Sequence, residues 1–341
     1  MVFKLITYLI KKLIFNLKFL PKLLNSGFLI YLSYLIYKRI ELLRKKAVTK
    51  TVFKNTYENR VILNQLEPID FIPSFFIPSY LTQAGFHEYK SVQKTFFKRE
   101  YILTKDKGLT SLDWVSGNKK DNLLIIVHGM TGGSESLYIR DISEGFSNNY
   151  SVVTIHARGI NDTPLITPFV YCAASTEDVA NALRHLRKNY SFKHVFLMGI
   201  SMGANITYKL LANNYEFNDY LTGFINISNF FHQLTSVQKN KDTLTDYFLV
   251  KLQKGYLHKY VDILKFNKDI DYDFLINKAT RLEQLIGTIG VKMFKYESEE
   301  DYYRKTESGP DIDKIKIKTL ILVAKDDPIV MLYNEDYSKS K

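Results

Sequence analysis

The chain has 341 residues and a formal net charge of +12, and 46% of its residues are hydrophobic. This length can bury a large core, and the composition excludes a wholly disordered chain. Residues 1–60 hold 13 basic and only two acidic side chains, whereas the rest of the chain holds 34 basic and 33 acidic ones. A nucleic-acid-binding domain would need its basic face on the folded part of the chain. The charge distribution therefore predicts contact with a membrane surface and no nucleic-acid partner.

Cys172 is the only cysteine, so the chain can form neither an internal disulfide nor a cysteine-based zinc site. A reducing compartment is the simpler expectation. The sequence holds no G-K-[ST] phosphate loop and no G-x-G-x-x-G dinucleotide pattern. We therefore predict neither a cofactor nor a metal.

The first 40 residues are predicted to attach the chain to a membrane. Along the apolar residues 1–22, four lysines recur on one helical stripe, as in a helix at a lipid interface: Lys4, Lys11, Lys18 and Lys22. Residues 23–37 carry no charge and, at ~1.5 Å per residue, span about 22 Å, less than the ~30 Å hydrocarbon core. A single-pass or deeply embedded anchor is the favoured interpretation, and an interfacial helix is the second. A cleaved signal peptide ranks third, and a pair of helices packed on the protein's own core is disfavoured by the basic face.

The pattern becomes regular from about residue 101 onward. Short apolar runs predict buried strands at 122–127, 151–157, 195–198, 221–227 and 317–323. Amphipathic segments predict helices at 136–146, 175–188 and 201–212, the second with a capping box formed by Ser175 and Asp178. This alternation indicates a mostly parallel α/β sheet flanked by helices.

The stretch 229–310 lacks strand patterning and is rich in Tyr, Lys and Leu. It is predicted to be a helical cap inserted over the carboxyl edge of the sheet. The predicted organisation is therefore a membrane anchor over residues 1–60 and one α/β domain over 61–341.

Residues 199–203 read Gly-Ile-Ser-Met-Gly and lie between a predicted strand and a predicted helix. A nucleophilic serine needs this setting, because a strained strand-to-helix turn pushes its hydroxyl into the open. Gly199 and Gly203 would let neighbouring backbone approach closely. The alternative is a glycine-rich turn that a serine merely caps. The context favours Ser201 as a nucleophile, with the positive end of the next helix near the developing oxyanion.

The first strong strand is followed by the sequence His-Gly-Met-Thr-Gly-Gly at 128–133. In enzymes that carry a nucleophilic serine on such a strand-to-helix turn, this loop supplies one donor to the oxyanion. We therefore expect the backbone N–H groups of Met130 and Met202 to form an oxyanion hole. His128 is interpreted as an imidazole that fixes the loop, and a role as general base is the alternative.

A late predicted strand is followed by two adjacent acids, Asp326 and Asp327, and then by a proline. One of these acids can orient a catalytic base and stabilise its imidazolium. Asp327 is preferred because it precedes the proline at the tip, and Asp326 is the reserve. A solvated turn acid is the alternative.

The sequence resembles the YheT-like branch of the α/β-hydrolases, which includes the abhydrolase-domain proteins one and three. The resemblance runs from about residue 67 to residue 333. The motifs that carry it are Leu112-Asp113-Trp114, HGMTGGSESLYIR at 128–140, Ala157-Arg158-Gly159, STEDV at 175–179, GISMG at 199–203 and DDPIV at 326–330. The resemblance implies the α/β-hydrolase fold and a Ser-Asp-His esterase or lipase. It assigns Ser201 as nucleophile, Asp327 as acid, and Met130 and Met202 as oxyanion donors.

The third member of the triad does not follow the family pattern. In this fold the order along the chain is Ser, Asp, His, but all seven histidines precede Asp327. We expect either an incomplete form of an active enzyme, without the last strand and helix, or an inactive relative, and we favour the first. This form should hydrolyse poorly, because loss of one triad member leaves only about 10³–10⁴-fold over water.

The predicted function is that of a membrane-associated serine hydrolase acting on acyl or lipid esters. The expected location is the endoplasmic reticulum or another intracellular membrane. The alternative is a catalytically inactive protein of the same fold that binds a lipid or a partner. The sequence makes no prediction of the oligomeric state.

Overall fold

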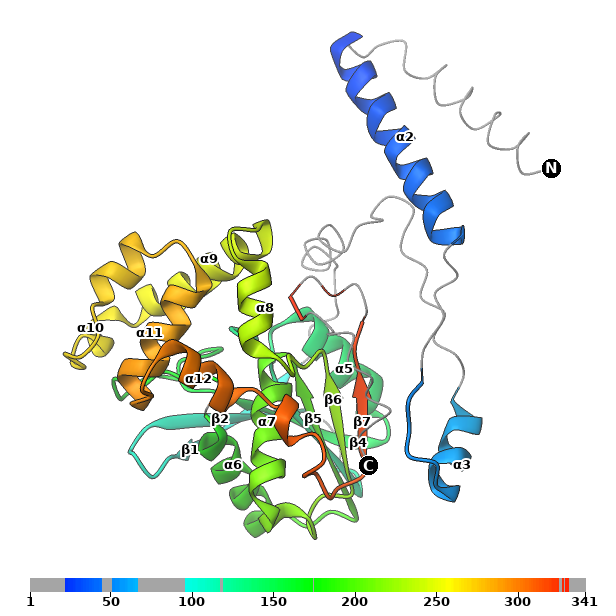
Figure 1. The fold of residues 1–341 in the computed structure, drawn as a ribbon. Coiled ribbons are helices and arrows are strands. Elements are labelled where there is room, and N and C mark those ends of the chain that lie inside the picture. The colour runs from blue at the N-terminus through cyan, green and yellow to red at the C-terminus, as the bar shows by residue number, and fades with distance from the viewer. Residues whose placement is uncertain are drawn as a thin grey trace. The chain divides into compact units, whose positions relative to one another are not determined.

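The computed structural model describes residues 22–44, 51–66, 96–116, 119–173, 175–324, 327 and 329–330. By its internal contacts the chain divides into two units, residues 1–89 and residues 90–341 (Figure 1). The boundary that the sequence places near residue 60 stays a prediction.

The described part of the first unit holds two helices, α2 (Lys22–Arg44) and α3 (Tyr57–Gln65). Thr56 caps α3, because its hydroxyl accepts a hydrogen bond from the N–H of Asn59 at 3.2 Å. In α2, seven large apolar or aromatic side chains are exposed: Phe28, Leu29, Ile30, Tyr31, Tyr34, Tyr37 and Ile40. Among the described residues, none of the helices is both long and apolar enough to cross a membrane. The lysine stripe before residue 22 lies outside the described residues.

The second unit is built on one sheet of seven strands. In chain order they are β1 (Phe97–Leu103), β2 (Leu109–Val115), β3 (Asn122–Val127), β4 (Tyr150–His156), β5 (His194–Ile200), β6 (Gly223–Ile227) and β7 (Thr319–Leu322). The spatial order is β1-β2-β4-β3-β5-β6-β7. The five strands β4, β3, β5, β6 and β7 run parallel to one another, whereas β2 pairs antiparallel with both β1 and β4.

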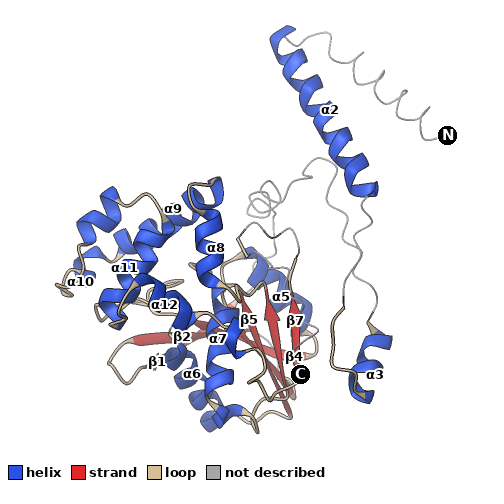
Figure 2. Cartoon of the chain, viewed as in Figure 1, coloured by secondary structure: helices blue, strands red, loops and turns tan. Residues whose placement is uncertain are grey.

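Three helices connect the parallel strands and cover both faces of the sheet (Figure 2): α5 (Leu137–Ser147), α6 (Thr176–Asn189) and α7 (Met202–Asn213). Because successive side chains of a strand point to opposite faces, β3 buries apolar residues on both sides. Leu124 and Ile126 belong to the core on the side of α5. Leu123 and Ile125 belong to the larger core on the side of α6 and α7.

A helical insertion lies between β6 and β7. Its elements are α8 (Gln233–Asn240), α9 (Leu244–Lys259), α10 (Val261–Leu264), the π-helical turn η2 (Phe274–Lys278), α11 (Leu282–Phe294) and α12 (Glu299–Thr306). Figure 1 shows these helices gathered beside the sheet. Buried residues of α9 and α11 extend the core that α6 and α7 share. The mostly parallel sheet with its helical insertion confirms the predicted fold class.

Two local predictions were incomplete or wrong. The hairpin of β1 and β2 was not predicted, because its first strand mixes Lys98, Arg99 and Glu100 with apolar residues at an edge of the sheet. The capping box of α6 is absent. Ser175 makes no side-chain cap bond and instead accepts the backbone N–H of Cys172 at 2.8 Å, while Asp178 pairs with an arginine.

Candidate active site

Ser201 lies at the junction where β5 ends and α7 begins. Its backbone has φ 54° and ψ −118°, a conformation that L-residues rarely adopt. The junction is held by two backbone hydrogen bonds, from Ser201 N–H to the carbonyl of Ile227 at 2.9 Å and from Asn205 N–H to the carbonyl of Ser201 at 3.1 Å. The serine side chain makes no capping bond to α7. Its strained backbone is therefore imposed by the surrounding structure and not by capping.

The two glycines that flank the serine allow close backbone contacts. A Cβ atom on Gly203 would overlap the carbonyl oxygens of Val127 and His128 at the end of β3. A Cβ atom on Gly199 would lie 2.7 Å from the Cα atom of Ala204. Both spacings are shorter than real Cβ atoms tolerate, so the turn requires glycine at both positions.

The loop after β3 passes directly beside Ser201. A Cβ atom added to Gly129 would lie 3.2 Å from Ser201 Cβ and 3.6 Å from Ser201 Oγ. The backbone on either side of Met130 is anchored: Gly129 N–H donates to Tyr138 Oη at 3.2 Å, and Thr131 N–H donates to Tyr171 Oη at 2.6 Å. The structure thus brings Gly129 beside the serine and fixes the backbone on both sides of Met130.

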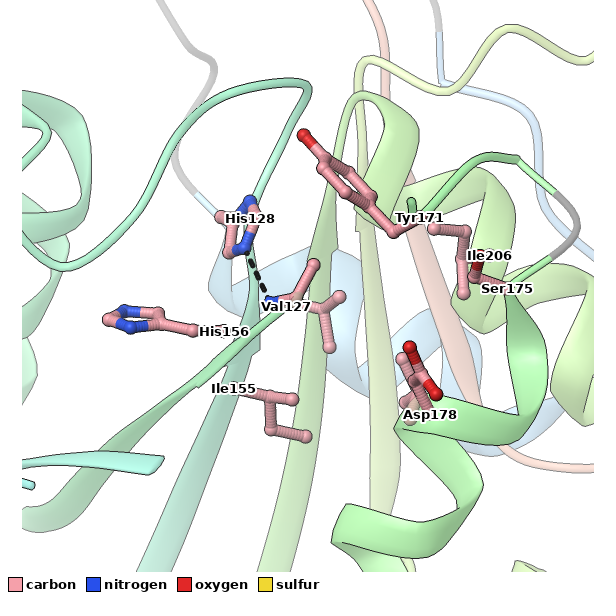
Figure 3. Close-up of a pocket in the computed structure, with 10 residues that line it drawn as sticks. Val127, His128, Ile155, His156, Tyr171, Ser175, Asp178 and Ile206 are labelled. Atoms are coloured by element: carbon pink, nitrogen blue, oxygen red, sulfur yellow. Dashed lines mark hydrogen bonds between the residues drawn. The ribbon is translucent and has the colours of Figure 1, made fainter. Parts of the chain in front are cut away.

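His128 is fully buried and has no free ring nitrogen. Its Nδ1–H donates to the carbonyl of Gly129 at 2.6 Å. Its Nε2 accepts the N–H of Ala157 at 3.2 Å, the bond drawn as a dashed line in Figure 3. Burial lowers the pKa of His128 to about 4, so the ring is neutral at neutral pH. With the Nε2 lone pair occupied, the ring binds the loop after β3 to the end of β4.

A second buried imidazole, His156, anchors the far end of the same loop. Its Nε2 accepts the N–H of Ser134 at 3.0 Å, and its Nδ1 lies 3.3 Å from Ser111 Oγ. Burial lowers the pKa of His156 to about 3. The 3.7 Å between its Nε2 and Asp113 Oδ2 is therefore a contact of a neutral ring and not an ion pair.

Asp113 on β2 is the charged centre of this network. Arg99 donates to both of its carboxylate oxygens, at 2.6 and 2.7 Å, and Ser134 Oγ donates to Oδ2 at 2.5 Å. Burial opposes ionisation of the carboxyl, but these donors hold its pKa below the usual range. Asn161 in turn donates to Ser134 Oγ at 2.8 Å. The network fixes Ser134 from three sides.

Arg158 forms a second buried ion cluster. Its guanidinium donates to both carboxylate oxygens of Asp178 at the start of α6, at 2.9 and 2.6 Å. It also donates to Asp106 in the turn between β1 and β2, at 2.7 and 3.2 Å. The side chain of Arg158 is only 7% exposed. The arginine therefore joins the antiparallel hairpin to the helix layer.

Asp327 follows β7. Its Oδ1 accepts the N–H groups of Ile329 and Val330, both at 2.9 Å, which closes a local turn. The strands β5, β6 and β7 are parallel neighbours, each ~4.8 Å from the next, so β5 and β7 are about 10 Å apart. Ser201 comes directly after β5 and Asp327 comes after β7, so both residues lie beyond the carboxyl edge of the sheet. Asp326, the reserve acid, lies outside the described residues.

A small cavity of about 20 Å³ lies behind the loop after β3. It is lined by His128, His156 and Tyr171 together with side chains of β4, α6 and α7 (Figure 3). This volume holds about one water molecule and no ester substrate. Within the described part of the chain, no cluster of His, Cys, Asp and Glu side chains could bind a metal ion.

Residues 122–340 match the family described as alpha/beta hydrolase fold. The chain belongs to the α/β-hydrolase family. The match runs from β3 past β7 and includes Ser201, the loop after β3 and Asp327. The family that the sequence motifs predict is confirmed.

Curated relatives of this chain carry the names of lipid and ester hydrolases. It is 27% identical to a monoacylglycerol lipase of Saccharomyces cerevisiae over 61% of this chain and 48% of that protein. It is 26% identical to phospholipase ABHD3 of Homo sapiens, over 68% of this chain and 59% of that protein. It is also 26% identical to the putative esterase YheT of Escherichia coli, over 61% of this chain and 62% of that protein. The chain thus spans about half the length of the curated relatives it matches. The predicted resemblance to the YheT-like branch is confirmed.

Among solved structures, an esterase of Pyrococcus furiosus resembles this chain with a TM-score of 0.43 and 15% identity, over 70% of this chain and 74% of that one.

The sequence motifs of this chain include residues whose structural contacts only the structure explains. From the sequence, Asp113 and Arg158 are named only as parts of motifs and Asp178 also as part of a capping box that the structure lacks, whereas Arg99 and His156 are not singled out. Asp113, His156 and Arg158 share a signal, because each is a charged or polar residue inside an apolar strand or at its end, where burial requires a partner. Arg99 in the mixed strand β1 and Asp178 in α6 carry no such signal. The partners themselves come from strands and helices far apart in the sequence.

Proposed function

We propose that this α/β hydrolase cleaves carboxylic esters, those of lipids in particular, with Ser201 as the nucleophile. The observation that carries the proposal is the backbone of Ser201, with φ 54° and ψ −118°. A serine that only capped α7 would need neither this strain nor two flanking positions at which any side chain would overlap its neighbours. Strain held by the surrounding structure is typical of a residue that presents its hydroxyl to a substrate.

The proposed oxyanion donors are the N–H groups of Met130 and Met202. Met202 is the first residue of α7, and the N–H groups of a first helical turn have no partner within the helix. Met130 lies between two residues whose N–H groups are bound to Tyr138 and Tyr171. Two such donors would stabilise the negative charge that develops on the ester oxygen when Ser201 Oγ attacks the carbonyl carbon.

Asp327 is the proposed acid that would orient a catalytic imidazole. Neither of the two imidazoles that line the cavity can act as that base, because His128 and His156 use both ring nitrogens in other contacts. His194 lies at the start of β5, which is the opposite edge of the sheet from Ser201. With no base assigned among these three histidines, we propose slow hydrolysis by this chain, limited by removal of the serine proton.

The proposed substrate class rests on the relatives and on the first unit. A monoacylglycerol lipase, a phospholipase and a putative esterase among the relatives support esters of lipids. The exposed apolar side chains of α2 support attachment of residues 1–40 to a membrane, for which we propose an intracellular one.

Labelling with a fluorescent fluorophosphonate tests the proposal, since the probe reacts with activated serines. We expect slow labelling of Ser201 that accelerates as free imidazole is added, because this small base can accept the serine proton. Ser201→Ala should abolish the signal. Ser228→Ala is the matched control, since Ser228 follows the neighbouring strand β6 and also has a positive φ of 51°. A folded chain that stays unlabelled in imidazole would contradict the proposal.

A second candidate function is a catalytically inactive protein that binds a lipid or a partner. The occupied ring nitrogens of His128 and His156 favour it. In that case Ser201 would remain unlabelled at every imidazole concentration, whereas fluorescent lipid analogues would still bind.

A further inference from the structure

The loop after β3 keeps the backbone N–H of Met130 free while it binds the N–H groups around it. From residue 129 to residue 134, every other N–H donates to an atom of the chain. The acceptors, in chain order of the donors, are Tyr138 Oη, Tyr171 Oη, the carbonyl of Gly129, Ser136 Oγ and His156 Nε2. Within the part of the chain that the structure describes, no atom accepts the N–H of Met130. This stretch of the loop therefore presents the proposed oxyanion donor and no competing one.

The direction of this N–H follows from the carbonyl at the other end of its peptide bond. A trans peptide is planar, so the N–H of Met130 points opposite to the carbonyl of Gly129. That carbonyl accepts hydrogen bonds from His128 Nδ1 at 2.6 Å and from the N–H of Gly132 at 3.2 Å. Because His128 is buried, these bonds direct the N–H of Met130 away from the buried side of the loop.

The turn that the Gly132 bond closes is strained at Thr131. Its φ of 57° lies in the left-handed region, which a β-branched residue rarely adopts because its side chain crowds the backbone. Turns with a positive φ at their third residue normally carry glycine or asparagine there. Without a further contact, Thr131 would relax to a negative φ and its N–H would change direction. The acceptor that holds this N–H is Tyr171 Oη, at 2.6 Å.

The hydroxyl of Tyr171 has a fixed position. The residue is only 3% exposed, and its ring packs edge-to-face on the rings of His128 and Tyr256, with centroids 6.1 and 5.8 Å apart. A buried ring packed on two sides cannot follow a change in the loop, so the loop must adapt to the hydroxyl.

We propose that Tyr171 is a positioning residue for the reaction at Ser201. By accepting the N–H of Thr131, its hydroxyl keeps the turn in the strained form in which the N–H of Met130 faces the developing oxyanion. This inference rests on the proposed function, because it assigns Tyr171 a role in the same oxyanion hole.

Labelling of Ser201 by the fluorophosphonate at a fixed imidazole concentration tests this role in the full chain. Tyr171→Phe keeps the ring and removes the acceptor. It should lower the maximal labelling rate by about tenfold, which is part of the ~10²–10³-fold loss that follows removal of a whole donor. The probe concentration that gives half of this rate should change by less than about twofold, because the donor acts on charge that develops only in the transition state.

Tyr208→Phe is the matched control. Tyr208 is also buried, and its hydroxyl donates to the carbonyl of Ile312 at 3.0 Å and not to the loop after β3. This variant loses a comparable hydrogen bond and should keep the labelling rate. Equal rates in the two variants would overturn the inference.

Thr131→Gly separates positioning from a general loss of stability. Glycine adopts a φ of 57° without strain, so the turn depends less on the hydroxyl of Tyr171. In the Thr131→Gly background, Tyr171→Phe should therefore lower the maximal rate by only about twofold. If Tyr171→Phe has the same effect in both backgrounds, the hydroxyl does not act through the turn, and the inference is wrong.

A measurement that does not need Ser201 distinguishes this inference from the proposed function. In the chain with isotope-labelled threonine, NMR follows the exchange of the Thr131 amide with solvent deuterium. Tyr171→Phe should accelerate this exchange by about tenfold, whereas the amide of Thr207 inside α7 should not respond. Unchanged exchange at Thr131 would overturn the inference even if Ser201 is labelled. A native chain whose Ser201 stays unlabelled in imidazole would contradict the proposed function, and the role of Tyr171 with it.

Discussion

His156 Nε2 accepts the backbone N–H of Ser134 at 3.0 Å, which joins the carboxyl end of β4 to the loop that follows β3. Ser134 completes the link by donating its hydroxyl to Asp113 on β2. Three neighbouring strands thereby hold the loop that passes beside Ser201. The polar network therefore restricts the backbone of this loop to one position, as apolar packing does for the strands of the sheet.

Asp113→Asn should destabilise the folded chain by about 3 kcal/mol. The substitution keeps the shape of the side chain but leaves the guanidinium of Arg99, whose side chain is only 22% exposed, without its counter-charge. Urea unfolding followed by the fluorescence of Trp114, the only tryptophan, measures the loss. Glu300→Gln is the control, because Glu300 and Arg304 are both more than half exposed and should contribute less than about 1 kcal/mol. A loss at Asp113 as small as the control would contradict this account.

The stability of the folded chain should fall as the pH decreases below about 6.5. Burial lowers the pKa of His128 to about 4 and of His156 to about 3, whereas an unfolded histidine titrates near 6.5. Between these values the unfolded chain binds more protons than the folded one, so acid favours unfolding. Between pH 6.5 and pH 5, each histidine should lower the free energy of unfolding by about 2 kcal/mol. This range lies above the pH at which carboxylates usually titrate.

Urea unfolding at several pH values measures this dependence. His156→Gln should remove about half of the slope, whereas His258→Gln should keep it, because His258 is exposed on α9. A slope unchanged in His156→Gln would show that the pH dependence has another source.

The fold could be predicted from the sequence wherever its pattern was local. The run at 122–127 and the turn at 199–203 are apolar or glycine-rich over consecutive residues, and the structure has β3 and the β5–α7 junction there. The hairpin of β1 and β2 was not predicted, because much of β1 faces solvent and its charged residues interrupt the apolar run that would indicate a strand.

The candidate site could be predicted only in part, for the same reason. Ser201 and the loop after β3 belong to contiguous motifs. The residues that hold them in place do not belong to contiguous motifs. Asp113 accepts a hydrogen bond from Ser134, which is 21 positions away in the chain, and Asp106 accepts one from Arg158, which is 52 positions away. Such pairings depend on strand order, and no local pattern encodes strand order.

Gly203→Ala should destabilise the chain by about 3 kcal/mol, because the new methyl group would overlap two carbonyl oxygens at the end of β3. Gly255→Ala is the matched control. Among the described residues, no atom outside the helix backbone lies within 4 Å of the Cβ position of Gly255, which is inside α9. The control should therefore stabilise the chain by about 0.5 to 1 kcal/mol, since alanine is the better helix former. Thermal unfolding of both variants measures the opposite signs, and a stabilising Gly203→Ala would refute the packing described here.

Ser201→Gly should stabilise the chain by about 1 to 2 kcal/mol. The backbone at φ 54° and ψ −118° is strained for any residue with a Cβ atom, whereas glycine adopts it freely. Ser201→Ala isolates this effect, because alanine removes the hydroxyl but keeps the strain, and it should leave the stability nearly unchanged. Urea unfolding of the three proteins measures the difference. If glycine and alanine have the same effect, the turn stores no strain, and the observation that carries the proposed nucleophile loses its force. If glycine alone stabilises, the chain holds a strained serine at a cost in stability, as a site selected for reactivity would.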